Sequence, residues 1–137
     1  MCWLILISMF KMTRVLLIEK DTFHGTAYMH ALDYILGSEN TDWRYGYEDA
    51  QSALKRSYDV YILGKMSDDS DVHLVIKLAE QIHRNDIPYK RILVITDDEI
   101  LLKSVQTRGM QTRNRRELKS HINIDEILIK VIEKATK

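Results

Sequence analysis

The sequence of 137 residues contains few of the residues that build irregular or cross-linked structures. It has one cysteine, Cys2, one proline, Pro88, and five glycines. A single cysteine excludes a disulfide within the chain and any metal cluster that needs several cysteines. The scarcity of proline and glycine favours regular elements joined by short loops. One cysteine also fits a reducing compartment, and we expect a cytoplasmic protein.

The sequence also lacks an excess of charge of either sign. Twenty basic and twenty acidic residues cancel, so no net charge attracts the chain to nucleic acid or to an anionic membrane. Hydrophobic residues make up 45% of the chain and charged residues 29%, as in an ordinary globular protein. A chain of this length is expected to form one domain.

The first eleven residues differ from the rest. The stretch MCWLILISMF is nearly uncharged but too short to span a bilayer, which needs about 20 residues. Lys11 follows this apolar run, whereas a signal peptide has basic residues before it. We expect residues 1–11 to lie outside the core, as an extension or the product of an upstream start codon, and residues 12–137 to form a single domain. The alternative is a hydrophobic anchor or dimer patch.

Strand and helix patterns alternate from Met12 onward. Continuous apolar runs predict buried strands at Val15–Ile18, Val60–Leu63 and 92–95, and the aromatic stretch 43–47 predicts a less regular strand. Helical spacing of apolar residues predicts helices at 22–36, 48–56, 69–84, 98–108 and 124–134. A fifth strand is expected within 110–122, where polar residues hide its position. This alternation predicts an α/β fold, a doubly wound five-stranded parallel sheet with helices on both faces.

Four stretches resemble the receiver domains of two-component response regulators. These are RVLLIEKD at 14–21, YEDAQSALKRSYDVYILG at 47–64, RILVITDD at 91–98 and NIDEILIKVIEK at 123–134. The resemblance covers residues 13–137 and rests mainly on the hydrophobic pattern. It implies the CheY-like, flavodoxin-like strand order 2-1-3-4-5.

The same resemblance implies a degenerate phosphorylation pocket. Receivers carry the phosphoacceptor aspartate at the end of the third strand, where this chain has Gly64, and hold Mg²⁺ with two acids after the first strand, where it has Glu19 and Lys20. Thr96 matches the family's hydroxyl residue, and Lys119 or Ser120 aligns with the lysine after the fifth strand. Glycine supplies no nucleophile, and a lysine places positive charge where the metal would bind. We therefore predict a pseudo-receiver without the phosphoacceptor, with no catalytic residue, resident metal or cofactor.

Acidic residues nevertheless cluster at the predicted carboxyl edge of the sheet. They are Glu19, Asp21, Asp68, Asp69, Asp97 and Asp98. Carboxylates are the ligands that Mg²⁺ prefers, and Glu19 and Asp21 are the candidate metal ligands. The competing explanation, which we favour, is helix capping, because Ser67, Asp68, Thr96 and Asp97 each immediately precede a predicted helix.

Three functions are compatible with these features. The first is a regulatory domain that acts through protein contacts, with an interaction surface at Met110, Arg113, Arg115 and Arg116 and a protein partner or a second copy of the chain. The second is an Mg²⁺-dependent phosphodiester enzyme, because VLLIEKD followed by VITDDE resembles the Toprim layout. The third is a small nucleic-acid-binding regulator that uses the basic residues within 108–119. We favour the first.

Overall fold

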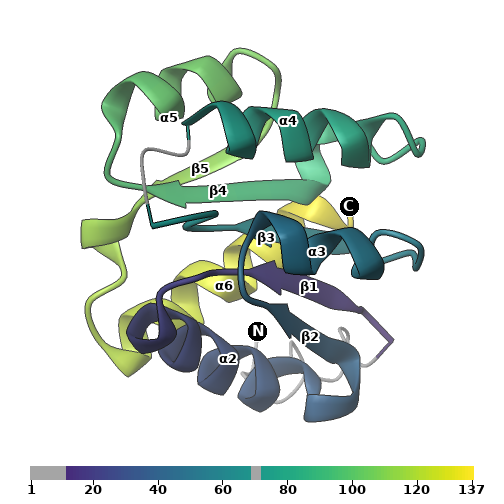
Figure 1. Cartoon of the computed structure of the whole chain (residues 1–137). Helices are drawn as coiled ribbons and strands as arrows, with labels where there is room; N and C mark the ends of the chain where they lie inside the picture. The colour runs from purple at the N-terminus through teal and green to yellow at the C-terminus, as the bar shows by residue number, and fades with distance from the viewer. Residues whose placement is uncertain (1–11, 69–71) are drawn as a thin grey trace.

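A computed structural model describes residues 12–68 and 72–137 of the chain. Residues 1–11, expected to form an extension, lie outside the described residues, as do residues 69–71 and therefore Asp69. A central sheet separates two layers of helices (Figure 1). No helix among the described residues is long and apolar enough to cross a membrane.

The sheet contains five parallel strands in the order β2-β1-β3-β4-β5, as the sequence predicted. The strands span Val15–Ile18 (β1), Thr41–Arg44 (β2), Val60–Leu63 (β3), Ile92–Thr96 (β4) and Gln111–Asn114 (β5). All residues of β1 and β3 are buried, because both faces of these strands are covered by helices.

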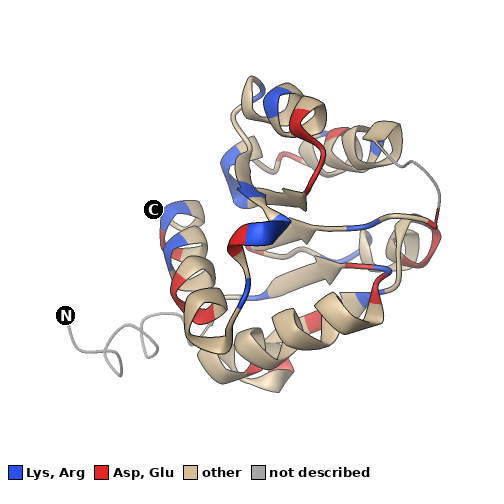
Figure 2. Ribbon diagram, turned by 90° about the vertical axis from the view of Figure 1, so that its left-hand side faces the viewer, with Lys and Arg blue, Asp and Glu red and all other residues tan. Residues whose placement is uncertain are grey.

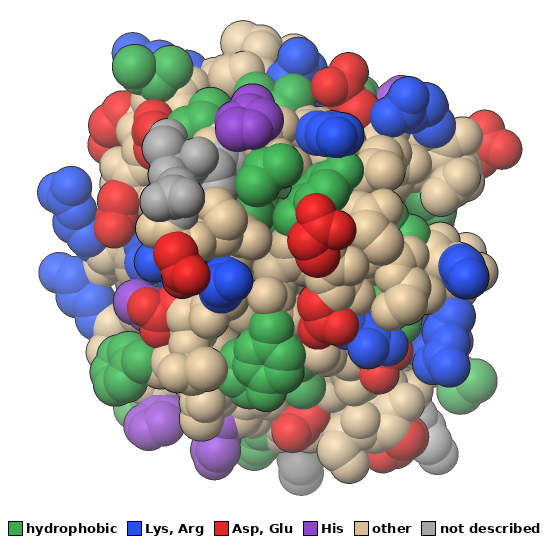
Figure 3. Space-filling view, viewed as in Figure 1, with side chains coloured by type: hydrophobic (Ala, Val, Ile, Leu, Met, Phe, Trp, Pro, Cys, Tyr) green, Lys and Arg blue, Asp and Glu red, His purple; other side chains and the backbone are tan. Residues whose placement is uncertain are grey.

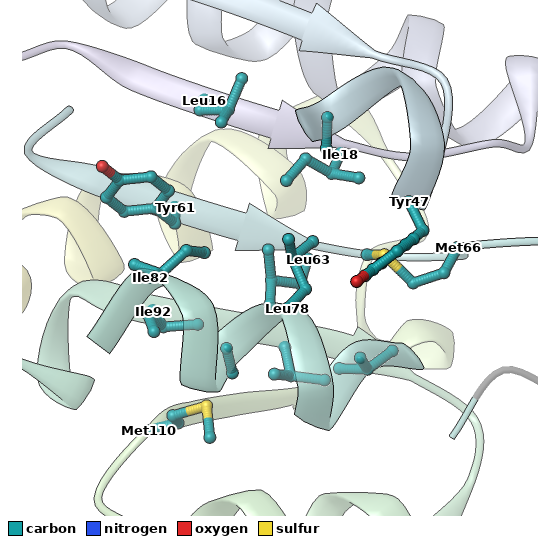
Figure 4. Close-up of a cluster of buried hydrophobic side chains, with 14 of the residues drawn as sticks. Leu16, Ile18, Tyr47, Tyr61, Leu63, Met66, Leu78, Ile82, Ile92 and Met110 are labelled. Carbon is teal, nitrogen blue, oxygen red and sulfur yellow. The ribbon is translucent and has the colours of Figure 1, made fainter. Parts of the chain in front are cut away.

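The helices divide between the two faces of the sheet. Helices α2 (Thr22–Leu36) and α6 (His121–Ala135) pack together on one face, and their apolar residues form one core with Leu17, Ile62 and Leu93. Helices α3 (Tyr47–Ala53), α4 (Val72–His83) and α5 (Glu99–Gln106) cover the other face. Figure 4 shows this second core, in which Met110 lies with Ile92 among the buried side chains.

The second strand lies two residues earlier than expected. Residues 43–47 were predicted as the strand, but pairing with β1 begins at Thr41 and ends at Arg44. Gly46 then adopts φ of 114° and precedes α3, and a Cβ atom there would lie 2.6 Å from the carbonyl oxygen of Met66. Only glycine fits this conformation and this close backbone approach. The aromatic stretch is therefore half strand and half turn.

The fifth strand can be polar because hydrogen bonds satisfy its buried side chain, that of Gln111. Gln111 is only 6% exposed, and its side-chain amide donates to the carbonyl oxygens of Lys90 and Val131 at 3.0 and 3.1 Å. A buried amide with its donors satisfied costs little. The strand thus joins β4 on one side and α6 on the other without an apolar run in its sequence.

Candidate functional site at the carboxyl edge of the sheet

The parallel register brings residues from four strands to one edge of the sheet. Ile18 pairs with Leu63, and Leu63 pairs with Val94, so Glu19 and Gly64 follow their strands side by side. On the other side Thr96 pairs with Asn114, and Arg115 is the next residue of the chain. Figure 2 views the sheet from this edge, where both basic and acidic segments gather. In such sheets the carboxyl edge is the usual place for a site.

Glu19 is the centre of this edge, and its side chain is completely buried. Its Oε2 accepts hydrogen bonds from the backbone N–H groups of Asp21 at 3.1 Å and Lys65 at 3.0 Å. Its Oε1 accepts from Nη1 of Arg115 at 2.8 Å. A buried carboxylate needs such partners, because an unpaired buried charge is strongly destabilising.

Gly64 makes room for this carboxylate. A Cβ atom at position 64 would lie 2.2 Å from Oε1 of Glu19 and 3.4 Å from Nη2 of Arg115. The Glu19 carboxylate therefore occupies the space that a side chain at position 64 would enter. A glycine here allows the close approach, which any larger residue would prevent unless Glu19 moved.

Arg115 supplies the cation of the site from the short 3₁₀ helix Arg115–Glu117 that follows β5. Its side chain is 14% exposed and also donates to the Tyr28 hydroxyl at 3.3 Å. Burial alone would lower the pKa of Arg115, but the charge and hydrogen bond of Glu19 together with Tyr28 and Asp97 outweigh it, and the pKa is raised. Burial has the opposite effect on a tyrosine and raises the pKa of Tyr28 to about 12. Arg115 is therefore charged and Tyr28 neutral at any ordinary pH.

Lys119, predicted from the resemblance to be the basic residue of this pocket, is placed elsewhere. It is exposed on the segment leading to α6, and its backbone N–H donates to Oδ1 of Asn123 at 3.1 Å. Arg115 takes the position beside Glu19 instead. The position of Arg115 directly after β5 indicates that it reaches the carboxyl edge. This indication could be used only once the polar strand had been located.

Lys20 does not enter the pocket either. Its ammonium group lies 3.7 Å from a carboxylate oxygen of Asp68, and the Asp68 side chain is 83% exposed. This is a surface ion pair, which contributes little to stability. Lys20 thus extends toward the loop after β3, away from the buried carboxylate.

The remaining acids at this edge serve mainly the helices. Asp98 caps α5 by accepting from the backbone N–H groups of Ile100 and Leu101, and Thr96 Oγ1 accepts from the Asp98 N–H at 3.1 Å. Asp21 caps α2 by accepting from the His24 N–H, and this hydrogen bond lowers the pKa of Asp21. Capping was expected at Ser67, Asp68, Thr96 and Asp97. The structure instead places the caps at Asp21 for α2 and at Asp98, one residue after Asp97, for α5, and Thr96 lies two residues before that cap.

A cavity of about 370 Å³ opens beside these residues. Gly64, Thr96 and Arg115 line it together with Asp21, Asp97 and Asp98. A divalent cation is a poor fit to these groups, because both oxygens of Glu19 already accept hydrogen bonds and one faces a guanidinium. The described residues contain no group of three or more potential metal ligands, and Glu19 and Asp21 do not converge on one point with a third acid.

The four residues predicted as an interaction surface are separated by the structure. Met110 is only 4% exposed and belongs to the core, and Arg115 belongs to the buried pair with Glu19. Arg113 is half-buried and donates to the carbonyl oxygen of Thr112. Arg116 alone is exposed. The four side chains therefore do not form one exposed surface.

The fold is that of CheY-like receiver domains. The chain aligns over 90% of its length with 92% of a signal receiver domain of a Luxo repressor protein from Vibrio parahaemolyticus, with a TM-score of 0.68 and 19% identity. It aligns over 88% of its length with 98% of the chemotaxis response regulator CheY4 of Vibrio cholerae, with a TM-score of 0.63 and 17% identity. A de novo designed Rossmann 2x3 protein is similar as well, with a TM-score of 0.66, 12% identity and coverage of 92% and 94% of the two chains.

No protein-family model matches the sequence, and no curated protein matches it either. Identities of this size establish the shared fold and nothing finer. The similarity to a designed protein makes the same point, because this architecture does not by itself specify a function. Function has to be argued from the residues at the carboxyl edge.

Proposed function

We propose that this chain is a regulatory domain of the receiver type that is not phosphorylated and acts through protein–protein contacts in signal transduction or transcription control. We further infer that it is not an enzyme, that it works in the cytoplasm, and that it forms homodimers. The proposal combines the receiver-like fold with the chemistry of the carboxyl edge.

The occupied space at Gly64 carries this proposal. A phosphoacceptor needs a carboxylate that is free to attack and a divalent ion to neutralise the phosphoryl oxygens. Here the space at the end of β3 is filled by the carboxylate of Glu19, which arrives from β1 and is held by Arg115. The guanidinium already neutralises this carboxylate internally, so neither the nucleophile nor the metal has a place.

The proposal is tested by incubating the whole protein with acetyl phosphate or beryllofluoride and Mg²⁺. We expect no phosphoryl adduct by intact mass and no change in the backbone amide spectrum, with a phosphorylatable receiver treated in parallel as control. A stoichiometric adduct, mapped for instance to Asp68 and abolished by Asp68→Asn, would show that a neighbouring carboxylate has taken over and would refute the proposal.

The contact surface we propose is the face formed by α5, β5 and α6. With Met110 and Arg115 buried, Arg116 remains as its exposed charge, and Ile100 on α5, 79% exposed, replaces Met110 as the apolar anchor. Apolar anchors set the lifetime of a complex, whereas charges at its rim set association rate and partner choice.

Sedimentation velocity of the wild type and two variants tests this surface. We expect the wild type to be a dimer. Ile100→Glu should raise the dissociation constant of the dimer at least tenfold, and Arg116→Glu should raise it less and in a salt-dependent way. Lys134→Glu, at the opposite end of α6, is the matched control and should leave association unchanged. A monomeric wild type would refute the homodimer, and a dimer unaffected by Ile100→Glu would place the interface elsewhere.

A further inference from the structure

A second, larger cavity lies on the α2 and α6 side of the carboxyl edge. It has a volume of about 1000 Å³ and is formed by the first turns of α2, the first turns of α6 and the segment 115–120 that leads into α6. Cavities of this size that combine apolar walls with a few polar groups are typical small-molecule sites. Neither the receiver-like fold nor the Glu19–Arg115 pair accounts for it.

The walls of this cavity are largely apolar. Ala27 and Tyr28 line it from α2, and Leu118 and Ile124 line it from the other side. Phe23 lies at its rim and is 80% exposed, which is unusual for a phenylalanine. An apolar body that entered the cavity would mainly cover Phe23 and Ala27, because Tyr28, Leu118 and Ile124 are already buried.

The charged side chains that line the cavity have one sign. They are Arg115, Arg116 and Lys119, and among the described residues that line it none is acidic; Asp21, which pairs with the lining His24, lies outside it. In a chain with equal numbers of acidic and basic residues, this bias is local. Acidic and basic side chains are instead interspersed on the face that Figure 3 shows. The cavity is therefore electrostatically complementary to an anion.

Helix α6 strengthens this bias. It has fifteen residues, begins at this cavity and carries no acidic residue in its first turn, whereas the amino end of α2 is already capped by the carboxylate of Asp21. The amino end of a helix carries a partial positive charge that favours anions. Ser120 accepts from the Asn123 N–H, so the earlier N–H groups of α6 are left for another acceptor.

We propose that this cavity binds a small amphipathic anion, that is, an apolar chain or ring system with one carboxylate, sulfonate or phosphate group. The apolar part lies against Ala27, Leu118 and Ile124, and the anionic group lies near Arg116, Lys119 and the start of α6. The proposal goes beyond the regulatory function proposed above and does not depend on it. The occupant is a dissolved molecule and not a membrane surface, because the apolar lining is concave.

The two cavities share a wall. His24 and Arg115 line both the larger cavity and the smaller one beside Gly64. Nη1 of Arg115 also contacts Tyr28, which lines the larger cavity, and Glu19, which is buried beside the smaller one. An anion bound in the larger cavity would therefore lie next to the guanidinium that holds the carboxyl edge together.

Two probes test the proposal on the whole protein. Binding of 8-anilinonaphthalene-1-sulfonate is followed by fluorescence and binding of dodecanoate by competition, with dodecanol and dodecyltrimethylammonium as neutral and cationic competitors. We expect 8-anilinonaphthalene-1-sulfonate and dodecanoate to bind at a single site. Dodecanoate should displace the fluorescent probe at a concentration at least tenfold lower than dodecanol or dodecyltrimethylammonium. Equal competition by the three dodecyl compounds would refute the anion preference.

Variants locate the site. We expect Arg116→Glu combined with Lys119→Glu to weaken dodecanoate binding by at least tenfold, and Ala27→Trp, which fills the cavity, to abolish it. Lys130→Glu combined with Lys134→Glu makes the same change of charge on α6 outside the cavity and should leave binding unchanged. Circular dichroism confirms that each variant is folded, and amide chemical shifts of dodecanoate-bound protein supply a readout that needs no variant.

Three results would overturn the proposal. The first is equal loss of binding in both charge-reversal pairs, which would indicate non-specific attraction. The second is chemical-shift changes confined to residues away from α2 and α6. The third is binding to anionic phospholipid vesicles in the absence of measurable dodecanoate binding, which would identify a membrane surface as the partner.

Discussion

The two ends of the sheet use the same kinds of side chain in different surroundings. At the carboxyl edge Glu19, Arg115 and Tyr28 form one network, and Glu19 is completely buried. At the amino edge Tyr58 donates to Asp42, and the Arg14 guanidinium lies 5.2 Å from the centre of the Tyr58 ring. Asp42 and Arg14 are only half-buried.

The difference between the two networks is therefore their access to water. Solvent can replace a lost partner at the amino edge, but it cannot reach the Glu19 carboxylate. The same chemical pair is then a surface contact at one end and a structural requirement at the other. Three substitutions, each with a matched variant, and one titration test this contrast.

The largest effect is expected for Arg115→Ala. It removes the partner of a buried carboxylate and should lower the free energy of unfolding by about 3–5 kcal/mol. Urea denaturation followed by circular dichroism measures the loss. Arg116→Ala, at the next and exposed position, is the matched control and should change stability by less than about 0.5 kcal/mol. Equal effects of the two substitutions would show that the buried pair is not a structural requirement.

The second effect is expected for Gly64→Ala. Its Cβ atom would collide with the Glu19 carboxylate, and overpacking of this kind costs about 1–3 kcal/mol. Shortening the acid with Glu19→Asp should relieve the collision, so the cost of Gly64→Ala should be smaller in that background. A double-mutant cycle measures this coupling. Strictly additive effects would mean that Glu19 does not fill the space at Gly64.

The tyrosines at the two ends predict a loss of stability at alkaline pH. Burial raises the pKa of both Tyr28 and Tyr58 to about 12, above the ordinary value of 10. Their contribution is fully present below pH 10 and is lost as the pH rises toward 12. Tyr28→Phe and Tyr58→Phe should each flatten the stability profile between pH 10 and 12 by a similar amount, because their pKa values are raised alike. Urea denaturation at several pH values measures the profiles, and a profile that neither substitution changes would contradict this prediction.

The smallest effect is expected for Lys20→Ala. Its partner Asp68 is largely exposed, and pairs of this kind contribute about 0–1 kcal/mol. Asp68→Ala should behave in the same way, within the error of chemical denaturation. A loss comparable to that of Arg115→Ala would mean that Lys20 supports the buried carboxylate after all.

The part of the fold that the sequence predicted is the part that hydrophobic burial determines. Strands β1 and β3 were located to the residue, because all their side chains are apolar and buried. Strand β5 could not be located, because its buried Gln111 is stabilised by hydrogen bonds to distant carbonyl groups and not by apolar contacts. Periodicity contains no information about such partners.

The candidate site was predictable in position but not in its partners. The position of Gly64 at the carboxyl edge could be inferred from the end of an apolar strand. That Glu19 fills the space and Arg115 holds it depends on two residues that are 96 positions apart. Met110, predicted at the surface because it adjoins a basic cluster, is buried because it follows α5 into the second core.

The wide separation of Glu19 and Arg115 in the chain has a consequence for the order of folding. The pair can form only after β1, β3, β4 and β5 have assembled, so the ion pair forms late, when these strands are already paired. Contacts that form this late contribute little to the folding transition state and mainly restrain the reverse reaction. The ion pair therefore mainly slows unfolding, and its removal should accelerate unfolding far more than it slows folding.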